Sequence, residues 1–449
     1  MKTALRLVVG ALALAVLSTG MASRSDASAT TPVITAGSKG VIQGSGASFP
    51  LTQYNKWITD IHAASPSVGF GTSSTTKLNI TYSSVGSTLG KSNFFGANAR
   101  KESQMFGGTD SMLSAAQEAN RDSATLDFIM VPMTAGPVAI IVNIPGITTT
   151  LKMNAEVICG IYSGEIKKWN DSKITALNPT VKALKTMDRV IVPVGRSDGS
   201  GTTNIFSQYL ATGASTAQSK CGYTSDWSAT HATTSFTGLT GTITPSDVQP
   251  GTKFAAMRIA NNATQAIEGG NTNTGVQAAV VATAYSIGYV EISYASGTGI
   301  RQVALATKSL NTTGANSGKP NYLVASASGA SAAMTRHLAD NTGAGESPVN
   351  PGRTVFLQPV NQLGLTSYPI VGYSWVLVYK KFVSTVTDAP TKGQVEGLIY
   401  FLNWSLVKGK AAVVTGTTTK AYVPLPANVR SAVIAQLKTV TYDGVTVWR

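Results

Sequence analysis

Residues 189–213 read RVIVPVGRSDGSGTTNIFSQYLATG, and this stretch shows the unit from which the fold can be predicted. The apolar run RVIVPV predicts a strand, GRSDGSGTT (195–203) predicts a turn, and the apolar residues of TTNIFSQYLATG recur at helical spacing. A strand, a glycine-rich turn and a helix in succession are typical of an α/β protein. The turn carries an arginine, an aspartate and several hydroxyl groups, so two interpretations compete: a catalytic serine turn, or a cradle for a small anion.

The same unit occurs twice more, and other segments fit the same architecture. The turn GSGASFP (44–50) precedes the helix-like LTQYNKWITDI, and SVGSTLG (84–90) follows the strand-like KLNITYSS. A long extended segment over 128–146 is predicted to be interrupted at Gly136-Pro137, and AEVICGIYSGEIKKW (155–169) is predicted to be helical. YPIVGYSWVLVYKKF predicts a strand, and VEGLIYFLNWSLVKGK and PANVRSAVIAQLKTV predict two helices. Residues 297–367 are rich in loops and give no clear pattern.

The N-terminus has the pattern of an export signal. Residues 1–29 begin with a basic region and continue into an apolar stretch that is too short to span a bilayer, followed by small residues. We expect a cleaved signal peptide without a lipid anchor, because no cysteine stands near it. The chain of 449 residues has a net charge of +14, and removal of 1–29 would leave +12. No later segment reaches about 18 uninterrupted apolar residues, so a soluble mature protein is expected.

Cysteine and histidine usage limits the chemistry. Two cysteines, Cys159 and Cys221, in an exported chain suggest a disulfide, although two buried free thiols are the alternative. The three histidines are scattered and no CxxC or HExxH motif is present, so no metal site and no cofactor are expected. Lysine and arginine are dispersed in pairs, without the basic stripe and interleaved aromatics of a nucleic-acid site.

The three turns predict an anion site. The N-terminus of a helix exposes unpaired N–H groups and a partial positive charge, glycines let a ligand approach them, and hydroxyls add donors. Arg196 would supply a planar fork for an oxyanion, and Asp198 could hold it in place. Ser48 and Thr202 have a plainer interpretation as helix N-caps. Asp110, in FGGTDSML, is either a turn residue or an acceptor for a ligand proton.

The enzymatic alternatives have weaker support. Residues 195–199 match G-x-S-x-G, the nucleophile elbow of serine hydrolases, with Ser197 as the nucleophile. Only His231 and His337 follow it, neither in a recognisable motif, and no HGGG-type segment precedes it. GRSDGSGTT lacks the lysine of a Walker loop, and GSGASF lacks the third glycine of a dinucleotide fingerprint.

An ordered set of motifs resembles a known family. GSGASFP, GGTDSM (107–112), CGIYSGEIKKWND (159–171) and GRSDGSGTT, followed by IGYVE and YPIVGYSWVLV, resemble the periplasmic phosphate-binding proteins that serve ABC transporters. The resemblance spans about 41–440. CGIYSG and the later SKCG look closer to the DING subfamily, although VIQ precedes GSGASFP here in place of the start that gives the subfamily its name.

The resemblance implies a set of phosphate contacts, with Asp198 orienting the arginine and with Cys159 and Cys221 paired in a disulfide. The second turn departs from the family pattern: where many relatives have a Ser-Gly-Gly run this chain has STLG, so the contact from Ser87 is the one that fits the pattern least. The implied contacts are Ser48, Phe49 (through its backbone), Ser87, Asp110, Arg196, Ser200, Gly201 and Thr202.

The resemblance also implies the architecture and the partners. It implies an α/β, two-lobed periplasmic-binding-protein fold of type II, with two mixed sheets flanked by helices, a ligand cleft between the lobes and two crossover strands near 131–136 and 367–372. Lobe one would comprise 41–135 and 369–449, and lobe two 136–368. The protein would be a monomer, not an enzyme, that binds phosphate, with arsenate as a competitor, and delivers it in the periplasm to the permease of a phosphate ABC transporter. A secreted, phosphate-scavenging surface protein without a transporter is the alternative.

Overall fold

The computed structural model describes most of the chain between residues 32 and 448. The described ranges are 32–64, 69–111, 113–121, 123–213, 234–235, 242–243, 267–340, 358–409, 415–416, 419–420 and 422–448. The predicted signal peptide, Cys221 and His231 lie outside these residues. Within them, no helix is long and apolar enough to cross a membrane.

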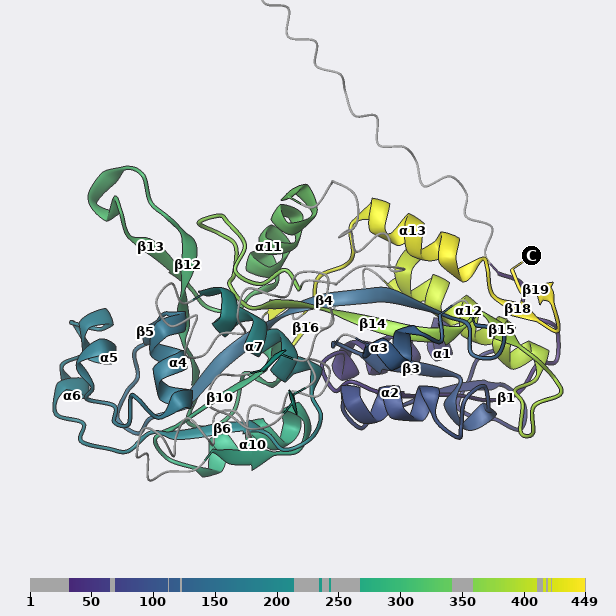
Figure 1. Cartoon of the computed structure of the whole chain (residues 1–449), viewed down its shortest axis with the longest axis horizontal. Coiled ribbons are helices and arrows are strands. Elements are labelled where there is room, and N and C mark those ends of the chain that lie inside the picture. Colours follow the sequence, from purple (N-terminus) through teal and green to yellow (C-terminus); the bar gives the residue numbers. More distant parts are fainter. Residues whose placement is uncertain are drawn as a thin grey trace, which may run out of the picture.

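One mixed sheet runs through both halves of the molecule (Figure 1). Its strand order is β2-β1-β3-β14-β4-β10-β6-β9, and β11 also pairs with β4. The pairs β1–β2, β1–β3, β6–β10 and β6–β9 are parallel, whereas β14 runs antiparallel to β3 and β4, and β10 and β11 run antiparallel to β4. The strands are β1 (Gly40–Gly46), β2 (Leu78–Ser84), β3 (Phe106–Thr109), β4 (Phe128–Asn143), β6 (Val192–Arg196), β9 (Glu268–Gly270), β10 (Ser286–Glu291), β11 (Ile300–Gln302) and β14 (Val371–Tyr379).

The long strand β4 joins the two lobes. It pairs with β14 as far as Pro137 and with β10 from Val138 onward. The interruption predicted at Gly136-Pro137 is therefore wrong: the strand is continuous, and it is the pairing partner that changes there. Pro137 is tolerated for two reasons: its fixed φ suits an extended chain, and it lies where β4 changes its pairing partner from β14 to β10, so the lack of an N–H does not interrupt either ladder. Ile370, just before β14, accepts a hydrogen bond from the backbone of Val138, so a second segment runs beside β4 at this transition.

Lobe one holds β1, β2, β3, β14 and the start of β4, and helices cover it. The first helix buries Tyr54, Trp57 and Ile61, as its apolar spacing predicts. The predicted C-terminal helices are present, and the first begins with a capping box between Thr391 and Gln394. The helices are α1 (Leu51–Ala64), α2 (Ser87–Phe95), α3 (Ala115–Glu118), α12 (Lys392–Val407) and α13 (Ala427–Leu437), with the 3-10 helix η2 (Glu102–Gln104).

Lobe two holds β6, β9, β10 and the end of β4; α7 and α10 pack against these strands, whereas α5 and α6 lie at the far end of the lobe near β5 (Figure 1). The helix predicted over 155–169 ends at Ser163, because Gly164 adopts a left-handed φ of 78° and caps it. The helices are α4 (Ala155–Ser163), α5 (Ser172–Leu177), α6 (Lys182–Lys185), α7 (Gly201–Gly213), α10 (Thr272–Ala282) and α11 (Ala327–Asp340), with η3 (Ile292–Tyr294) and η4 (Gly314–Asn316).

Four small sheets complete the described structure. One three-stranded sheet joins β12 and β13, from the region 297–367 that gave no clear sequence pattern, to β5, and the other joins β15 to the two C-terminal strands. They are β13 (Pro320–Leu323) with β12 (Ala304–Leu310) and β5 (Lys152–Met153); β15 (Lys381–Phe382) with β18 (Thr441–Tyr442) and β19 (Val445–Thr446); β16 (Thr415–Gly416) with β17 (Thr419–Lys420); and β7 (Thr234–Ser235) with β8 (Thr242–Ile243).

Candidate functional site: a cluster of hydrogen-bond donors between the lobes

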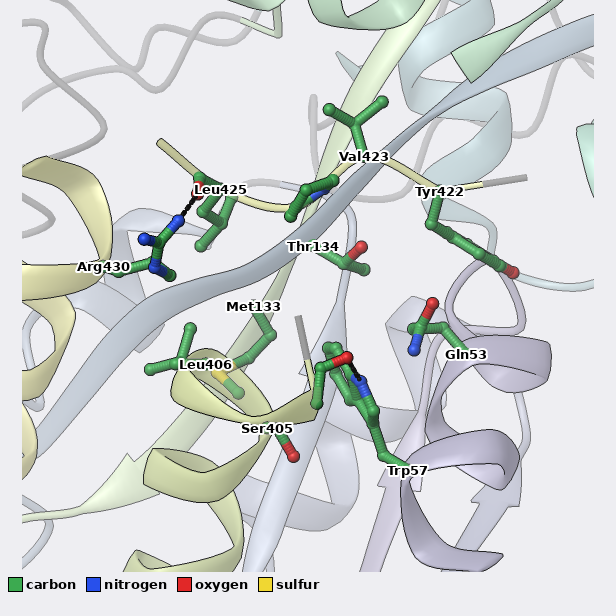
Figure 2. A pocket seen from close by; sticks show the side chains of 12 residues that line it. Gln53, Trp57, Met133, Thr134, Ser405, Leu406, Tyr422, Val423, Leu425 and Arg430 are labelled. Atoms are coloured by element: carbon green, nitrogen blue, oxygen red, sulfur yellow. Dashed lines mark hydrogen bonds between the residues drawn. The ribbon is translucent and has the colours of Figure 1, made fainter. Parts of the chain in front are cut away.

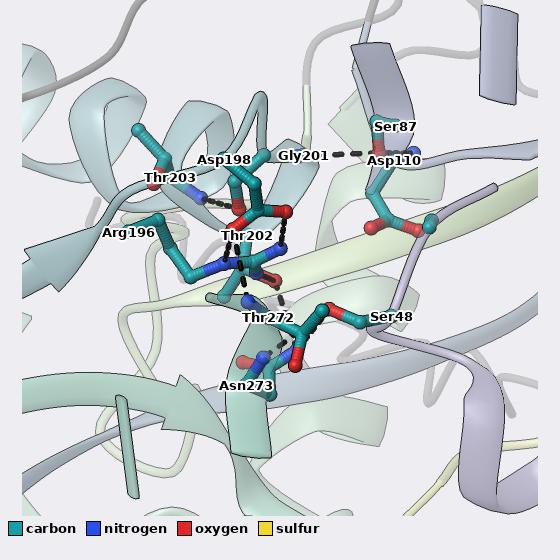
Figure 3. Close-up of polar contacts among 12 residues, drawn as sticks. Ser48, Ser87, Asp110, Arg196, Asp198, Gly201, Thr202, Thr203, Thr272 and Asn273 are labelled. Atoms are coloured by element: carbon teal, nitrogen blue, oxygen red, sulfur yellow. Dashed lines mark hydrogen bonds and ion pairs between the residues drawn. The ribbon is translucent and has the colours of Figure 1, made fainter. Parts of the chain in front are cut away.

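Polar side chains from both lobes meet where the strand ends give way to helices (Figure 3). Lobe one contributes the turns after β1, β2 and β3, and lobe two contributes the turns after β6 and β9. Within each lobe the parallel strands bring their carboxyl ends to one edge, and the two sets of strands run in opposite directions, so their carboxyl ends face each other at the junction of the lobes. The three turns singled out from the sequence all reach this junction.

Arg196, the last residue of β6, is buried and held by Asp198. Its Nε lies 2.7 Å from Asp198 Oδ1, and its Nη2 lies 2.5 Å from Asp198 Oδ2, which is a bidentate ion pair. The backbone N–H of Thr272 donates to the same carboxylate at 2.9 Å. Burial pushes the pKa of Asp198 upward, but the bonds and charge of Arg196 and the Thr272 N–H hold it below its usual value. Arg196 is therefore a buried positive charge that Asp198 holds in place.

Ser87 links the two lobes through hydrogen bonds to its side-chain oxygen. Its Oγ accepts from the backbone N–H of Asp110 at 3.1 Å and from that of Gly201, at the start of α7, at 3.2 Å. The approach is close because Gly86 lacks a side chain: a Cβ there would collide with Asp198 and with the backbone of Gly199. Gly86 also has a φ of 87°, which glycine adopts without strain.

Ser48 and Thr202 meet across the same interface. Ser48 Oγ accepts from the backbone N and the Nδ2 of Asn273, at 3.4 and 3.0 Å. Thr202 Oγ1 accepts from Arg196 Nη1 at 3.4 Å and from Asn273 Nδ2 at 3.3 Å. A hydroxyl oxygen has two lone pairs and one proton. Since Ser48, Ser87 and Thr202 each accept two N–H bonds, each keeps only its O–H proton to offer.

Asp110 places one acceptor among these donors. It follows β3, is 1% exposed, and its Oδ1 accepts from Ser374 Oγ at 2.6 Å. Its Oδ2 is buried and is one of the few side-chain oxygens without a hydrogen-bond partner in the described part of the chain. Burial raises the pKa of Asp110 to about 7, against the opposing effects of Ser374, Arg196 and Ser87.

The remaining predicted contacts lie at helix starts. Ser200 Oγ accepts from the backbone N–H of Thr203 at 3.1 Å and so caps α7. Thr202, for which capping was the plainer interpretation, lies inside the first turn of α7, with its hydroxyl in the cluster. Phe49 is fully buried before α1, and its carbonyl accepts from Tyr422 Oη at 2.7 Å.

Three further residues belong to the cluster and were missed in the sequence. Thr272 and Asn273 begin α10, and Ser374 lies in β14. EGGNTNTG (268–275) has the same form as the other turns, a strand followed by glycine, small polar residues and a helix, so Thr272 and Asn273 carried a signal. Ser374 is a polar residue within an apolar strand, and only the pairing of β14 with β3 and β4 brings it to Asp110.

The serine of the hydrolase alternative does not join the cluster. Ser197 is exposed, whereas its neighbours Arg196 and Ser200 are buried. Of the described histidines, His62 accepts a hydrogen bond from the backbone of Ile80, and His337 lies near the ring of Tyr373, with ring centroids 6.2 Å apart. The described residues form no cluster of metal ligands.

A small cavity lies apart from the cluster, between α1, β4, α12 and the segment 422–425 (Figure 2). Its free volume is about 10 Å³, at most the size of one water molecule. Trp57 Nε1 donates across it to the carbonyl of Gly409 at 2.9 Å. Its size and largely apolar lining make it part of the packing of lobe one.

A model of the PBP superfamily domain matches residues 28–405. The chain belongs to the PBP superfamily. Among curated relatives, it is 29% identical to the phosphate-binding protein PstS of Pasteurella multocida over 91% of this chain and 93% of that protein. It is also 29% identical to PstS of Haemophilus influenzae, over 89% and 92% of the two chains.

Two solved structures share the fold. One is a high affinity periplasmic phosphate-binding protein (PfluDING) bound with phosphate, with a TM-score of 0.56 and 22% identity over 88% of this chain and 93% of that one. Another is an ancestral soluble variant of the human phosphate binding protein, with a TM-score of 0.57 and 22% identity over the same shares. The predicted two-lobed α/β fold and the resemblance to phosphate-binding proteins are therefore confirmed, but the two mixed sheets that the resemblance implied are one continuous mixed sheet, because β4 pairs with strands of both lobes.

Proposed function

We propose that this chain binds inorganic phosphate in the cluster between the lobes and delivers it to the membrane permease of a phosphate ABC transporter. The names of its relatives support this assignment. The observation that carries it is the composition of the cluster: hydroxyls left with only a proton to donate, a buried arginine, and one unpartnered carboxylate oxygen.

This composition matches a protonated tetrahedral oxyanion. Arg196, the hydroxyls of Ser48, Ser87 and Thr202, and the N–H groups at the start of α7 would donate to the phosphate oxygens. Asp110 Oδ2 would accept the proton that monohydrogen and dihydrogen phosphate carry. Sulfate at neutral pH has no such proton, whereas arsenate has the same protons and nearly the same shape. Arsenate therefore competes and sulfate is excluded.

The contacts come from both lobes, so phosphate would favour the closed arrangement. We assign 41–135 and 369–449 to lobe one and 136–368 to lobe two, with the exchange at β4 and the segment before β14. Cleavage of residues 1–29 on export would leave a monomeric protein in the periplasm.

A disulfide would stabilise lobe two. Cys159 is buried in α4 and is disulfide-bonded. Its predicted partner, Cys221, lies outside the described residues, so the pairing remains a prediction. Closing a loop of roughly 60 residues would add about 4 kcal/mol in the chain-entropy model. Thiol titration of the denatured, unreduced protein should detect no free thiol, and two thiols would contradict the pairing.

The cluster binds an anion without a group that would transform it. Asp198 is paired with Arg196, and the unpartnered Oδ2 of Asp110 would accept the proton of the anion. Titration calorimetry with phosphate and sulfate tests the proposal, since tight phosphate binding is expected. Turnover of a nitrophenyl ester, lost in Ser197→Ala, would instead favour the hydrolase.

A further inference from the structure

We propose that Asn273 is a positioning residue that fixes Ser48 and Thr202 as hydrogen-bond donors toward the bound oxyanion, one from each lobe. The inference rests on the proposed function and deepens it. Asn273 is fully buried at the start of α10, and Figure 3 shows it beneath Arg196 and beside Ser48.

The orientation of the Asn273 amide is set by the backbone. Its Oδ1 accepts from the N–H of Glu291, the last residue of β10, at 3.0 Å. With the oxygen held there, the two protons of Nδ2 are directed to the other side of the amide. Nδ2 donates them to Ser48 Oγ, at an N–O distance of 3.0 Å, and to Thr202 Oγ1, at 3.3 Å.

These two bonds decide what the hydroxyls can do. Ser48 Oγ also accepts from the backbone N of Asn273, and Thr202 Oγ1 also accepts from Arg196 Nη1. With both lone pairs of each oxygen occupied, each hydroxyl can only donate. A hydroxyl whose oxygen already accepts two hydrogen bonds can offer only its proton to an oxyanion. Little free energy is then lost in reorienting the hydroxyl when the anion binds, because it is already in the donating arrangement.

The contacts of Asn273 do not serve its own helix. The N-cap of α10 is Asn271, whose side chain makes no capping bond, and the Asn273 side chain bonds to β10, α7 and the turn before α1. The amide therefore links lobe one to lobe two through the groups that would hold the ligand. This predicts that its loss raises the dissociation rate of phosphate as well as disordering the donors.

The test compares Asn273→Ala and Asn273→Asp with a matched pair, Asn178→Ala and Asn178→Asp. Asn178 is also buried in lobe two, and it too accepts from one backbone N–H and donates from Nδ2 to two oxygens, but these are the carbonyls of Lys152 and Ile174. Both pairs should lower the melting temperature without phosphate. Only the Asn273 variants should weaken phosphate binding: about 10-fold for alanine, and 100-fold or more for aspartate, which draws the hydroxyl protons to itself and repels the anion.

A mutant cycle separates positioning from a structural role. In a Ser48→Ala, Thr202→Val background, where the hydroxyls are gone, Asn273→Ala should cost less than about 2-fold in phosphate affinity. An undiminished loss in that background, or an Asn273→Asp protein that folds and binds phosphate as the wild type does, overturns the inference. If Asn273→Asp does not fold, the alanine cycle decides. Failure of the wild type itself to bind phosphate would instead refute the proposed function.

Discussion

Asp110→Asn should reduce the preference of the site for phosphate over sulfate. Because Ser374 donates to Oδ1, the amide oxygen of the asparagine takes that position and Nδ2 occupies the place of the unpartnered Oδ2. The acceptor for a phosphate proton thereby becomes a donor. At pH 8 monohydrogen phosphate and sulfate are both dianions, so the wild-type carboxylate repels both anions, by about 4 kcal/mol per unit charge at about 4 Å with an effective dielectric of about 20, and the preference must come from the proton that only phosphate carries. Its bond to a phosphate proton adds about 1.5–3 kcal/mol.

Sulfate lacks this proton and leaves Oδ2 buried and unpaired beside the anion, which costs about 1–3 kcal/mol more, so the preference for phosphate over sulfate can reach about 10⁴-fold in the wild type. In Asp110→Asn the repulsion is gone and sulfate gains a donor, so the preference should fall below about 10-fold, mostly through tighter sulfate binding. Titration calorimetry with both anions at pH 8 measures this ratio. Asp127→Asn is the control, since Asp127 is a buried carboxylate of lobe one paired with Lys380 outside the cluster. An Asp110→Asn protein with an unchanged ratio would refute the role given to Asp110.

Three other outcomes are expected. Arg196→Ala should weaken phosphate binding by several kcal/mol, since a fixed cation is lost and its aspartate is left facing the anion; near-native affinity in calorimetry would remove Arg196 from the site. Gly201→Ala should abolish tight binding, because a Cβ there would lie 2.5 Å from both Asp110 Cβ and Ser87 Oγ, whereas Gly71→Ala, whose Cβ would meet only the flexible Lys77 side chain, should bind normally. Burial raises the pKa of Glu291 to about 8, although hydrogen bonds from Ser293 and Tyr422 oppose this rise. Glu291 therefore stabilises the fold fully below its unfolded pKa of 4.5, and this stabilisation is lost as the pH rises toward 8, by up to about 1.4 kcal/mol per pH unit. Glu291→Gln should flatten that decline in thermal melts between pH 5 and 8, and a melting temperature that falls as steeply as in the wild type would contradict it.

The sequence predicted the convergence of the three turns because the signal is local. A strand, glycines, hydroxyls and a helix are contiguous, and the sheet topology then brings such turns to the junction of the lobes, two from one side and one from the other. EGGNTNTG has the same local form, so Asn273 was within reach of the same reasoning. Ser374 was not, because its contact with Asp110 arises from antiparallel pairing between residues 264 positions apart.

Boundaries were harder to predict than elements. Gly136-Pro137 reads as a break, yet β4 passes through it because the sheet pairs both sides of the dipeptide with different strands. Gly164 ended a helix that the apolar pattern would have continued, since its left-handed backbone caps α4. In both cases tertiary context outweighed the local signal.

The most direct test of the account is equilibrium dialysis of the purified, unmodified chain with labelled phosphate at pH 8, against excess sulfate and against excess arsenate. We expect one tight phosphate site per chain, from which arsenate displaces the labelled phosphate and sulfate does not. The absence of tight phosphate binding, or displacement by sulfate as effective as by arsenate, would contradict it.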